Sequence, residues 1–223
     1  MKKLLRVLAL AAAAPMSHAG VINFDDLSLT YFDAIASNYA DHGLAGNGDP
    51  RVGVSYSGSN GADNHLSFWI DLNGNLLKVA FTPTDGTTAQ ITLTADAGWL
   101  IQSIAFDLAA WPMITLPHWP AVDILTDVFY ALDGVSVDAP GTLILGMTAP
   151  HVSNFSLSNA SGAQVATMRW GTDWDVAIDN INFTVIRDPN AAVPEPGTLA
   201  LAALALLAAT RGRARPGAYS LRV

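Results

Sequence analysis

Residues 90–95 read QITLTA, and residues 180–185 read NINFTV. In both segments apolar and polar residues alternate with a period of two, which is typical of a β-strand with one buried and one exposed face. The apolar positions hold Ile, Leu, Phe and Val, which are frequent in strands, or Ala. These two segments predict a fold in which each strand turns one face toward a hydrophobic core.

Further segments have the length and composition of strands, and turn residues separate nearly all of them. The turns include Asp133-Gly134 and Ser161-Gly162, since Gly, Asn and Asp suit tight turns. About eleven short strands predict an all-β fold, a two-sheet antiparallel β-sandwich of the jelly-roll type. The one helical periodicity, over residues 31–40, is short. The additional strand segments are 21–24, 52–57, 66–70, 76–81, 100–108, 122–130, 142–145, 152–157 and 165–170.

The composition between the two chain ends excludes several classes of function. Residues 20–192 contain eighteen acidic side chains, all of them Asp, and four basic ones, which gives a formal charge of −14. This charge argues against binding to nucleic acid, and the exclusive use of Asp favours loops that join strands. The chain has no cysteine, so disulfides, thiol chemistry and iron–sulfur clusters are excluded. No nucleophile-elbow or zinc-protease motif is present.

The first nineteen residues have the organisation of a secretory signal peptide. Lys2, Lys3 and Arg6 precede an apolar run over residues 7–14, and a small-residue pattern ends at Ala19. This order of basic, apolar and small residues predicts a signal-peptide helix that is removed by cleavage near Ala19.

The C-terminal region combines a Pro-Glu-Pro motif with an apolar run and a basic cluster. The motif is Val193-Pro194-Glu195-Pro196, the run is 199–209 and the cluster is 211–215. The run is shorter than the ~20 apolar residues that span a bilayer. This order resembles the PEP-CTERM sorting signals of Gram-negative bacteria. The resemblance implies transient insertion of a hydrophobic sorting helix in the inner membrane, followed by cleavage by an exosortase-type protease.

These two end segments define the expected domains. We expect a signal peptide over 1–19, a β-sandwich domain over 20–190, a sorting signal over 191–215 and a short tail over 216–223. Together they predict export through the general secretory route. The sorting resemblance implies a final location in the cell envelope, at the outer surface or in the extracellular matrix.

The last predicted strand contains an acid in an unfavourable phase. If residues 177–185 form a regular strand, Asp179 shares the apolar face with Ile181 and Phe183. A buried carboxylate without a partner is costly, so either a β-bulge or a bound cation must compensate.

The same strand and the first one carry a second resemblance. Asp25 and Asp26 follow the first strand, and Asp179 and Asn180 lie in the last. This pairing is similar to jelly-roll domains of the carbohydrate-binding, galactose-binding-like type, in which the closing Asp often ligates a structural calcium. The resemblance implies a calcium site made by Asp25, Asp26, Asp179 and Asn180, because calcium takes oxygen ligands. The alternative is that the first two are turn residues and Asp179 is hydrogen-bonded in a bulge.

Six tryptophans are available to fill a core or to stack on sugar rings. Two of them flank residues 112–118, where X-Pro steps hold an extended loop that presents both rings to a ligand or closes on the sandwich as a hydrophobic lid. A third stands between two Asp residues, in a turn or at the rim of a site. The candidate ligand-binding residues are therefore Trp111, Trp119 and Trp174, whereas Trp69, Trp99 and Trp170 are expected in the core.

The features together predict an exported, non-enzymatic protein that binds polysaccharide or contributes to a biofilm matrix. Proteins with PEP-CTERM signals typically accompany exopolysaccharide production, and this part of the prediction rests on that resemblance. The first alternative is a structural or adhesive surface protein that binds another protein. The second is a polysaccharide-cleaving enzyme, which requires two Asp carboxyls about 5 to 10 Å apart.

Overall fold

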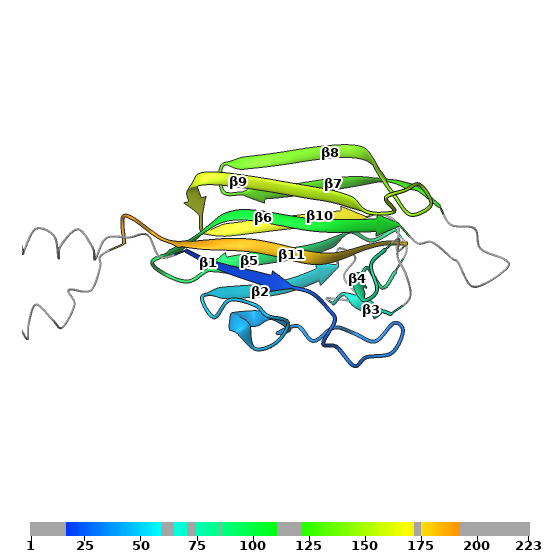
Figure 1. Cartoon of the computed structure of the whole chain (residues 1–223), viewed down its shortest axis with the longest axis horizontal. Helices are drawn as coiled ribbons and strands as arrows, with labels where there is room; N and C mark the ends of the chain where they lie inside the picture. The colour runs from blue at the N-terminus through cyan, green and yellow to red at the C-terminus, as the bar shows by residue number, and fades with distance from the viewer. Residues whose placement is uncertain are drawn as a thin grey trace, which may run out of the picture. The chain divides into compact units, whose positions relative to one another are not determined.

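The computed structural model describes residues 17–58, 65–70, 75–84, 86–110, 122–171 and 175–191. Within these residues eleven strands and one short 3-10 helix, η1 (Asp41–Gly43), are found, and the strands form two antiparallel sheets (Figure 1). The two-sheet antiparallel β-sandwich is therefore confirmed. The predicted signal-peptide helix and sorting helix lie outside the described residues. All strands belong to a compact unit, Met1–Pro189, and residues 190–223 form a second unit.

The two sheets share the strands almost equally. Sheet A consists, in spatial order, of β3 (Ser67–Trp69), β4 (Val79–Phe81), β11 (Val176–Arg187), β6 (Trp99–Ala110) and β9 (Ser153–Ala163), and β1 (Ser17–Ile22) also pairs with β11. Sheet B consists, in spatial order, of β2 (Val52–Gly58), β5 (Ala89–Ala95), β10 (Val165–Gly171), β7 (Ile124–Leu132) and β8 (Val135–Ile144). From β4 to β7 and from β8 to β11 successive strands alternate between the sheets, as they do in a jelly roll.

The inner faces of both sheets form one hydrophobic core. The apolar residues of the two alternating segments, on β5 and β11, are buried as predicted, and the polar residues between them are mostly exposed or half-buried. Trp170 is fully buried, and its indole Nε1 donates to the carbonyl oxygen of Val176 at 3.1 Å. Trp170 is thus a core residue, as expected, whereas Trp69 and Trp99 are only half-buried.

The short helix predicted over residues 31–40 is wrong. Phe32 and Ala40 have φ angles of 66° and 61°, which a right-handed helix does not allow. Ala34 forms a bridge to Ser67, and the backbone N–H of Ile35 donates to Leu66. The segment therefore satisfies its backbone groups against the chain around β3, and its helical spacing of apolar residues is overridden by tertiary contacts.

Strand β1 begins earlier than predicted. Its first three residues, 17–19, lie in the expected signal peptide and pair with Thr184, Val185 and Ile186 of β11. Cleavage near Ala19 stays a prediction, and it would remove the first half of β1. Within the part of the chain that the structure describes, no helix is both long and apolar enough to cross a membrane.

Candidate functional site

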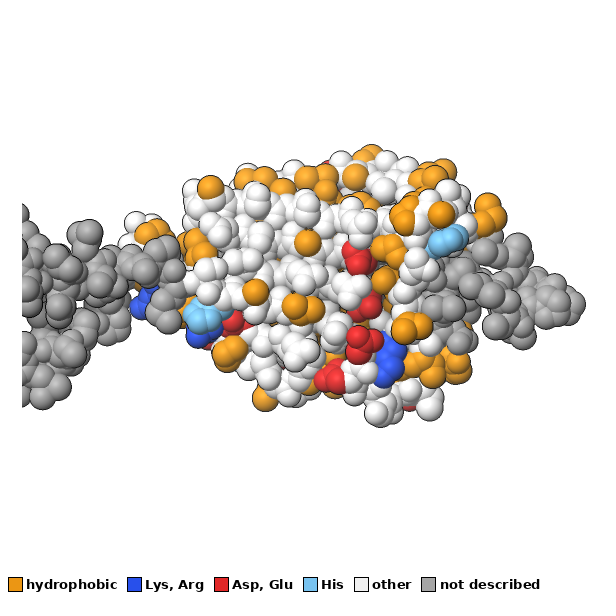
Figure 2. All heavy atoms as spheres, in the orientation of Figure 1, with side chains coloured by type: hydrophobic (Ala, Val, Ile, Leu, Met, Phe, Trp, Pro, Cys, Tyr) orange, Lys and Arg blue, Asp and Glu red, His pale blue; other side chains and the backbone are white. Residues whose placement is uncertain are grey.

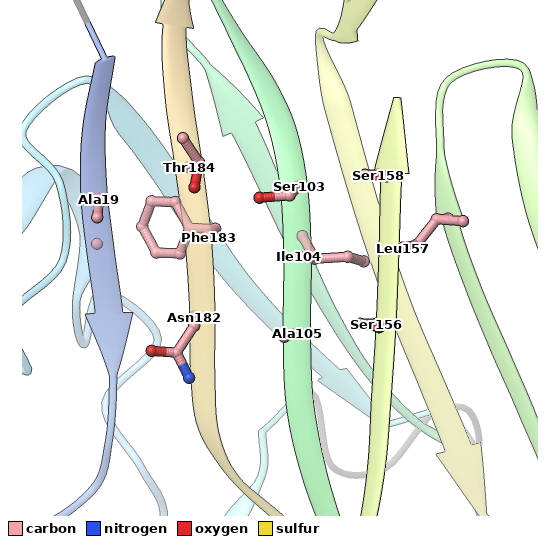
Figure 3. Close-up of a pocket in the computed structure, with 11 residues that line it drawn as sticks. Ala19, Ser103, Ile104, Ala105, Ser156, Leu157, Ser158, Asn182, Phe183 and Thr184 are labelled. Carbon is pink, nitrogen blue, oxygen red and sulfur yellow. The ribbon is translucent and has the colours of Figure 1, made fainter. Parts of the chain in front are cut away.

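The outer face of sheet A, turned to the viewer in Figures 1 and 2, is hollowed by a groove of about 560 Å³. The groove crosses β1, β11, β6 and β9 (Figure 3). Its polar side chains are small hydroxyls and one amide, supplied by Ser103, Ser156, Ser158, Asn182 and Thr184. A shallow groove with such a lining offers hydrogen-bond donors and acceptors without steric bulk.

Strand register arranges these side chains in rows across the sheet. Residues that face each other on neighbouring strands project from the same face, so each row is a line of adjacent side chains. In Figure 3 the hydroxyls of Thr184 and Ser103 lie at the boundary between β11 and β6. Read from β11 through β6 to β9, the rows are Thr184, Ser103 and Ser158, followed by Asn182, Ala105 and Ser156.

The groove lining is uncharged, and carboxylates begin in the next row. Asp107 follows Ala105 on the same face of β6. Its Oδ1 accepts a hydrogen bond from the Asn154 amide at 2.5 Å, and its Oδ2 accepts one from the Asn180 amide at 2.9 Å. Figure 2 shows carboxylates gathered toward this end of the face. Asp107 is therefore held in place by two neighbouring strands at the end of the groove.

A β-bulge in β11 sets the orientation of the last strand. The register with β6 shifts between Asp179 and Asn182, and Asn180 has a φ of 52°. The extra residue lets Ile178 and Ile181 both point into the core. Asp179 is opposite Asp107 and therefore lies on the outer face, so the bulge resolves the unfavourable phase that the sequence implies.

Asp179 nevertheless remains covered. It is only 5% exposed, and its Oδ1 is buried without a hydrogen-bond partner. Burial raises the pKa of Asp179 to about 7, and the charges of Asp25 and Asp107 add to this shift, while backbone N–H groups at Asn180 and Phe24 oppose it. The chain that follows β1 thus supplies part of the environment that disfavours the ionised carboxylate.

The four residues predicted to bind calcium interact with different partners. Asp25 lies near enough to Asp179 for its charge to raise that pKa, and Asn180 contacts Asp107. Asp26 instead contacts the Tyr39 hydroxyl at 2.5 Å and accepts the Gly46 backbone N–H at 3.1 Å. In residues 17–191, the masked gaps excepted, no three Asp, Glu, His or Cys side chains are grouped closely enough to hold a metal ion. Among these four residues, Asp179 has a buried side-chain oxygen without a hydrogen-bond partner in the described part of the chain.

An apolar cluster continues the outer face of sheet A beyond Asp107. Ala109 on β6 is opposite Ala177 on β11, which is opposite Phe81 on β4. Trp69 and Val152 pack against this cluster. The outer face therefore changes along the strands from polar, through acidic, to apolar.

The tryptophans predicted to bind a ligand, Trp111, Trp119 and Trp174, lie outside the described residues, as does the Pro-Glu-Pro motif. Sequence reasoning did not select the residues of the groove. The available signal was that the outward positions of β9 over residues 154–158 and of β11 over residues 182–184 consist of Ser, Asn and Thr.

Solved structures with a similar chain course include carbohydrate-binding proteins, but the similarity is weak. A carbohydrate-binding module of family 29 is 10% identical over 76% of this chain and 89% of that chain, with a TM-score of 0.35. A family 29 module complexed with mannohexaose is 9% identical over 76% and 92%, with a TM-score of 0.35. An exo-β-1,3-galactanase from Phanerochaete chrysosporium is 13% identical over 58% and 27%, with a TM-score of 0.30. The fold assignment therefore rests on the strand pairing of this chain.

Comparison of the sequence with known proteins identifies a sorting motif near the C-terminal end of the chain. No curated protein matches the sequence. Residues 192–215 match the PEP-CTERM protein-sorting motif, and they include all four residues predicted for sorting, Val193 to Pro196. The chain therefore carries the PEP-CTERM sorting signal of an exported protein.

Proposed function

We propose that this protein is a non-enzymatic component of the cell surface or extracellular matrix that binds polysaccharide through the groove on sheet A. The observation that carries the proposal is the pair of rows of hydroxyl and amide side chains across β11, β6 and β9. Ser and Thr hydroxyls both donate and accept, and an Asn amide does so with separate atoms. Sugar hydroxyls need the same mixture of partners.

The exported location is given by the sorting motif, and the remaining steps are part of the proposal. An exosortase-type protease recognises Pro194 to Pro196 while the apolar run is inserted in the inner membrane, and it then removes the tail. The sandwich is released to the outer surface or matrix, where an exopolysaccharide is its partner and biofilm formation its context. The match to the sorting motif supports this route.

We propose binding rather than cleavage because of how the two carboxyls in the row next to the groove are held. Asp107 and Asp179 face each other on β6 and β11, as the two carboxyls of a glycosidase would across a glycosidic bond. However, Asp179 is 5% exposed and covered by the chain after β1, so it does not reach a sugar in the groove. Both oxygens of Asp107 already accept amide hydrogens.

The test is affinity electrophoresis of the full chain in mild non-ionic detergent through gels that contain galactomannan, xylan, β-1,3-glucan or alginate. Retardation by one of these polymers is expected. Thr184→Val and Ser158→Ala in the groove should each weaken it by up to about tenfold, as the loss of one hydrogen bond implies. Ser55→Ala is the matched control, because Ser55 is an exposed serine on β2, an edge strand of sheet B. Equal retardation of groove and control variants would place the glycan site outside the groove, and no retardation by any of the four polymers would move the function to the protein-binding alternative.

We propose in addition that a calcium ion binds at Asp179. The buried Oδ1 without a partner and the neighbouring charge of Asp25 support this, since a cation would remove both costs. At a calcium concentration of one hundred times the Kd, binding should increase the free energy of unfolding by about 2.7 kcal/mol. The melting temperature should therefore rise when calcium is added. Asp179→Ala should abolish the effect. A melting curve that is the same in calcium and in chelator would contradict the proposal.

A further inference from the structure

Three aromatic side chains form a platform near the end of the outer face of sheet A. The rings of Tyr31 and Phe32 lie 4.5 and 5.1 Å from the ring of Trp69, and Phe32 lies 5.6 Å from Phe81. Tyr31 and Phe32 are 43% and 46% exposed. We call Tyr31, Phe32 and Trp69 the aromatic platform. It presents two large rings to solvent on a base of packed aromatic side chains.

The aromatic platform and the groove are on the same face of the sheet. Positions 103, 105 and 107 of β6 alternate with buried positions and project outward together, and Ala109 continues the same phase but is itself buried in the apolar cluster. Ala109 is joined through Ala177 to Phe81, and Phe81 lies beneath the platform. Ser103 and Ala109 are separated by six residues, or about 20 Å along a strand. Figure 2 shows hydrophobic side chains beyond the carboxylates at this end of the face.

The backbone holds the Phe32 ring outward in an unfavourable conformation. Phe32 has a φ of 66°, in the left-handed region that bulky residues avoid. Its N–H donates to the Phe68 carbonyl at 3.0 Å, and the backbone and hydroxyl of Thr30 both donate to Asp33 at 2.8 Å. Strain of this kind, maintained by surrounding hydrogen bonds, is concentrated at functional sites. Glycine would relieve it but would not supply a ring.

We propose that the glycan-binding face runs from the groove past Asp107 to the aromatic platform, so that the ligand is a polysaccharide chain long enough to cover both. This inference rests on the proposed function. In the groove, hydroxyls and Asn182 bind the polar edges of the sugars. At the platform, Tyr31 and Phe32 stack on the apolar face of a sugar ring. Between them lies Asp107, fixed by Asn154 and Asn180, and the lone pairs of its carboxylate that these two amides leave free accept hydrogen bonds from sugar hydroxyls.

Two substitutions at the aromatic platform distinguish a binding role from a structural one. Phe32→Gly removes the ring and suits the left-handed backbone, so relief of backbone strain offsets part of the packing that is lost against Trp69 and Phe81. Tyr31→Ala removes the second exposed ring. Leu125→Ala is the control, because Leu125 is an exposed apolar residue on β7 of sheet B.

The experiment uses the full chain and the polymer, among galactomannan, xylan, β-1,3-glucan and alginate, that retards it most. Affinity is measured by titration calorimetry with that polymer and with its partial hydrolysate, separated by chain length. Affinity is expected to rise with chain length and then to level off. Phe32→Gly should lower affinity for long chains about tenfold and leave the affinity for short chains unaffected, in a protein that still unfolds cooperatively near the wild-type melting temperature.

Three results would overturn the inference or its basis, and they can be told apart. If no polymer binds, the proposed function fails and this inference fails with it. If polymers bind but Phe32→Gly and Tyr31→Ala behave as Leu125→Ala does, the groove binds glycan and the platform does not. If a single sugar or a disaccharide binds as tightly as the polymer, the face does not extend beyond the groove.

Discussion

Asn in place of Asp179 should stabilise the protein at neutral pH when metal is removed. The folded pKa of this carboxyl is about 7, against 3.8 for an exposed one. The difference of about three pKa units corresponds to about 4 kcal/mol at 1.36 kcal/mol per unit. This is an upper figure, because an amide must also find partners for its hydrogens. Asp25 and Asp107 are nearby acceptors.

The sign of the pH dependence follows from the raised pKa. Below pH 3.8 the carboxyl is protonated in both states and carries no penalty. As the pH rises toward 7, the unfolded chain ionises while the folded protein does not, so stability falls; above pH 7 the full penalty applies. Asp179→Asn removes the group that titrates, so the variant should equal the wild type near pH 4 and exceed it increasingly up to pH 7.

The assay is urea unfolding of residues 17–190, in chelator, at half-unit steps from pH 4 to 8. Asp138→Asn is the control, because Asp138 is exposed on β8. The reasoning is refuted if Asp179→Asn and the wild type keep a constant difference in the free energy of unfolding across this range. It is also refuted if the control reproduces the change.

Three other substitutions test separate parts of the chain. Gly146→Ala places a methyl group 2.4 Å from the Val122 carbonyl oxygen, so it should cost about 1–3 kcal/mol in the free energy of unfolding, measured with urea. Asp123 accepts backbone N–H groups from Gly146 and Thr148, which hold its pKa below the usual value. Its contribution to stability is therefore present above pH 4 and lost on acidification, and a pH series of melting temperatures should show a smaller acid loss for Asp123→Asn. Glu195→Ala should block removal of the tail and leave the protein in the membrane fraction, as detected by immunoblotting.

The sequence predicted the sandwich well because burial of one strand face leaves a period-two pattern. β5 and β11 could be read in this way, since each alternates a buried aliphatic or aromatic residue with a polar one. The helix predicted over residues 31–40 was wrong because the spacing of its apolar residues arises from tertiary contacts and not from a local period. Ile35 and Tyr39 have helical spacing and are both buried, but the Ile35 N–H donates to Leu66, next to β3, and the Tyr39 carbonyl accepts the Tyr56 hydroxyl from β2.

The groove could not be predicted because its property is collective. Ser103 and Ser158 are each ordinary solvent-facing residues in their own strands. They become part of one surface only through the register of β6 with its neighbours, which is a long-range feature that one sequence does not contain. Asp179 was recognisable because its conflict is local, between a carboxylate and an apolar phase.

The bulge at Asn180 connects the fold to the candidate site. Without the extra residue, Asp179 and Phe183 would project from the same face, and either the core would contain a carboxylate or the outer face an exposed ring. With it, Phe183 stays in the core, Asp179 turns outward beneath the chain after β1, and the Asn180 amide reaches Asp107. The residue that corrects the phase of the last strand also fixes the carboxylate at the end of the groove. The stability of β11 and the geometry of the proposed glycan-binding face therefore depend on the same backbone irregularity.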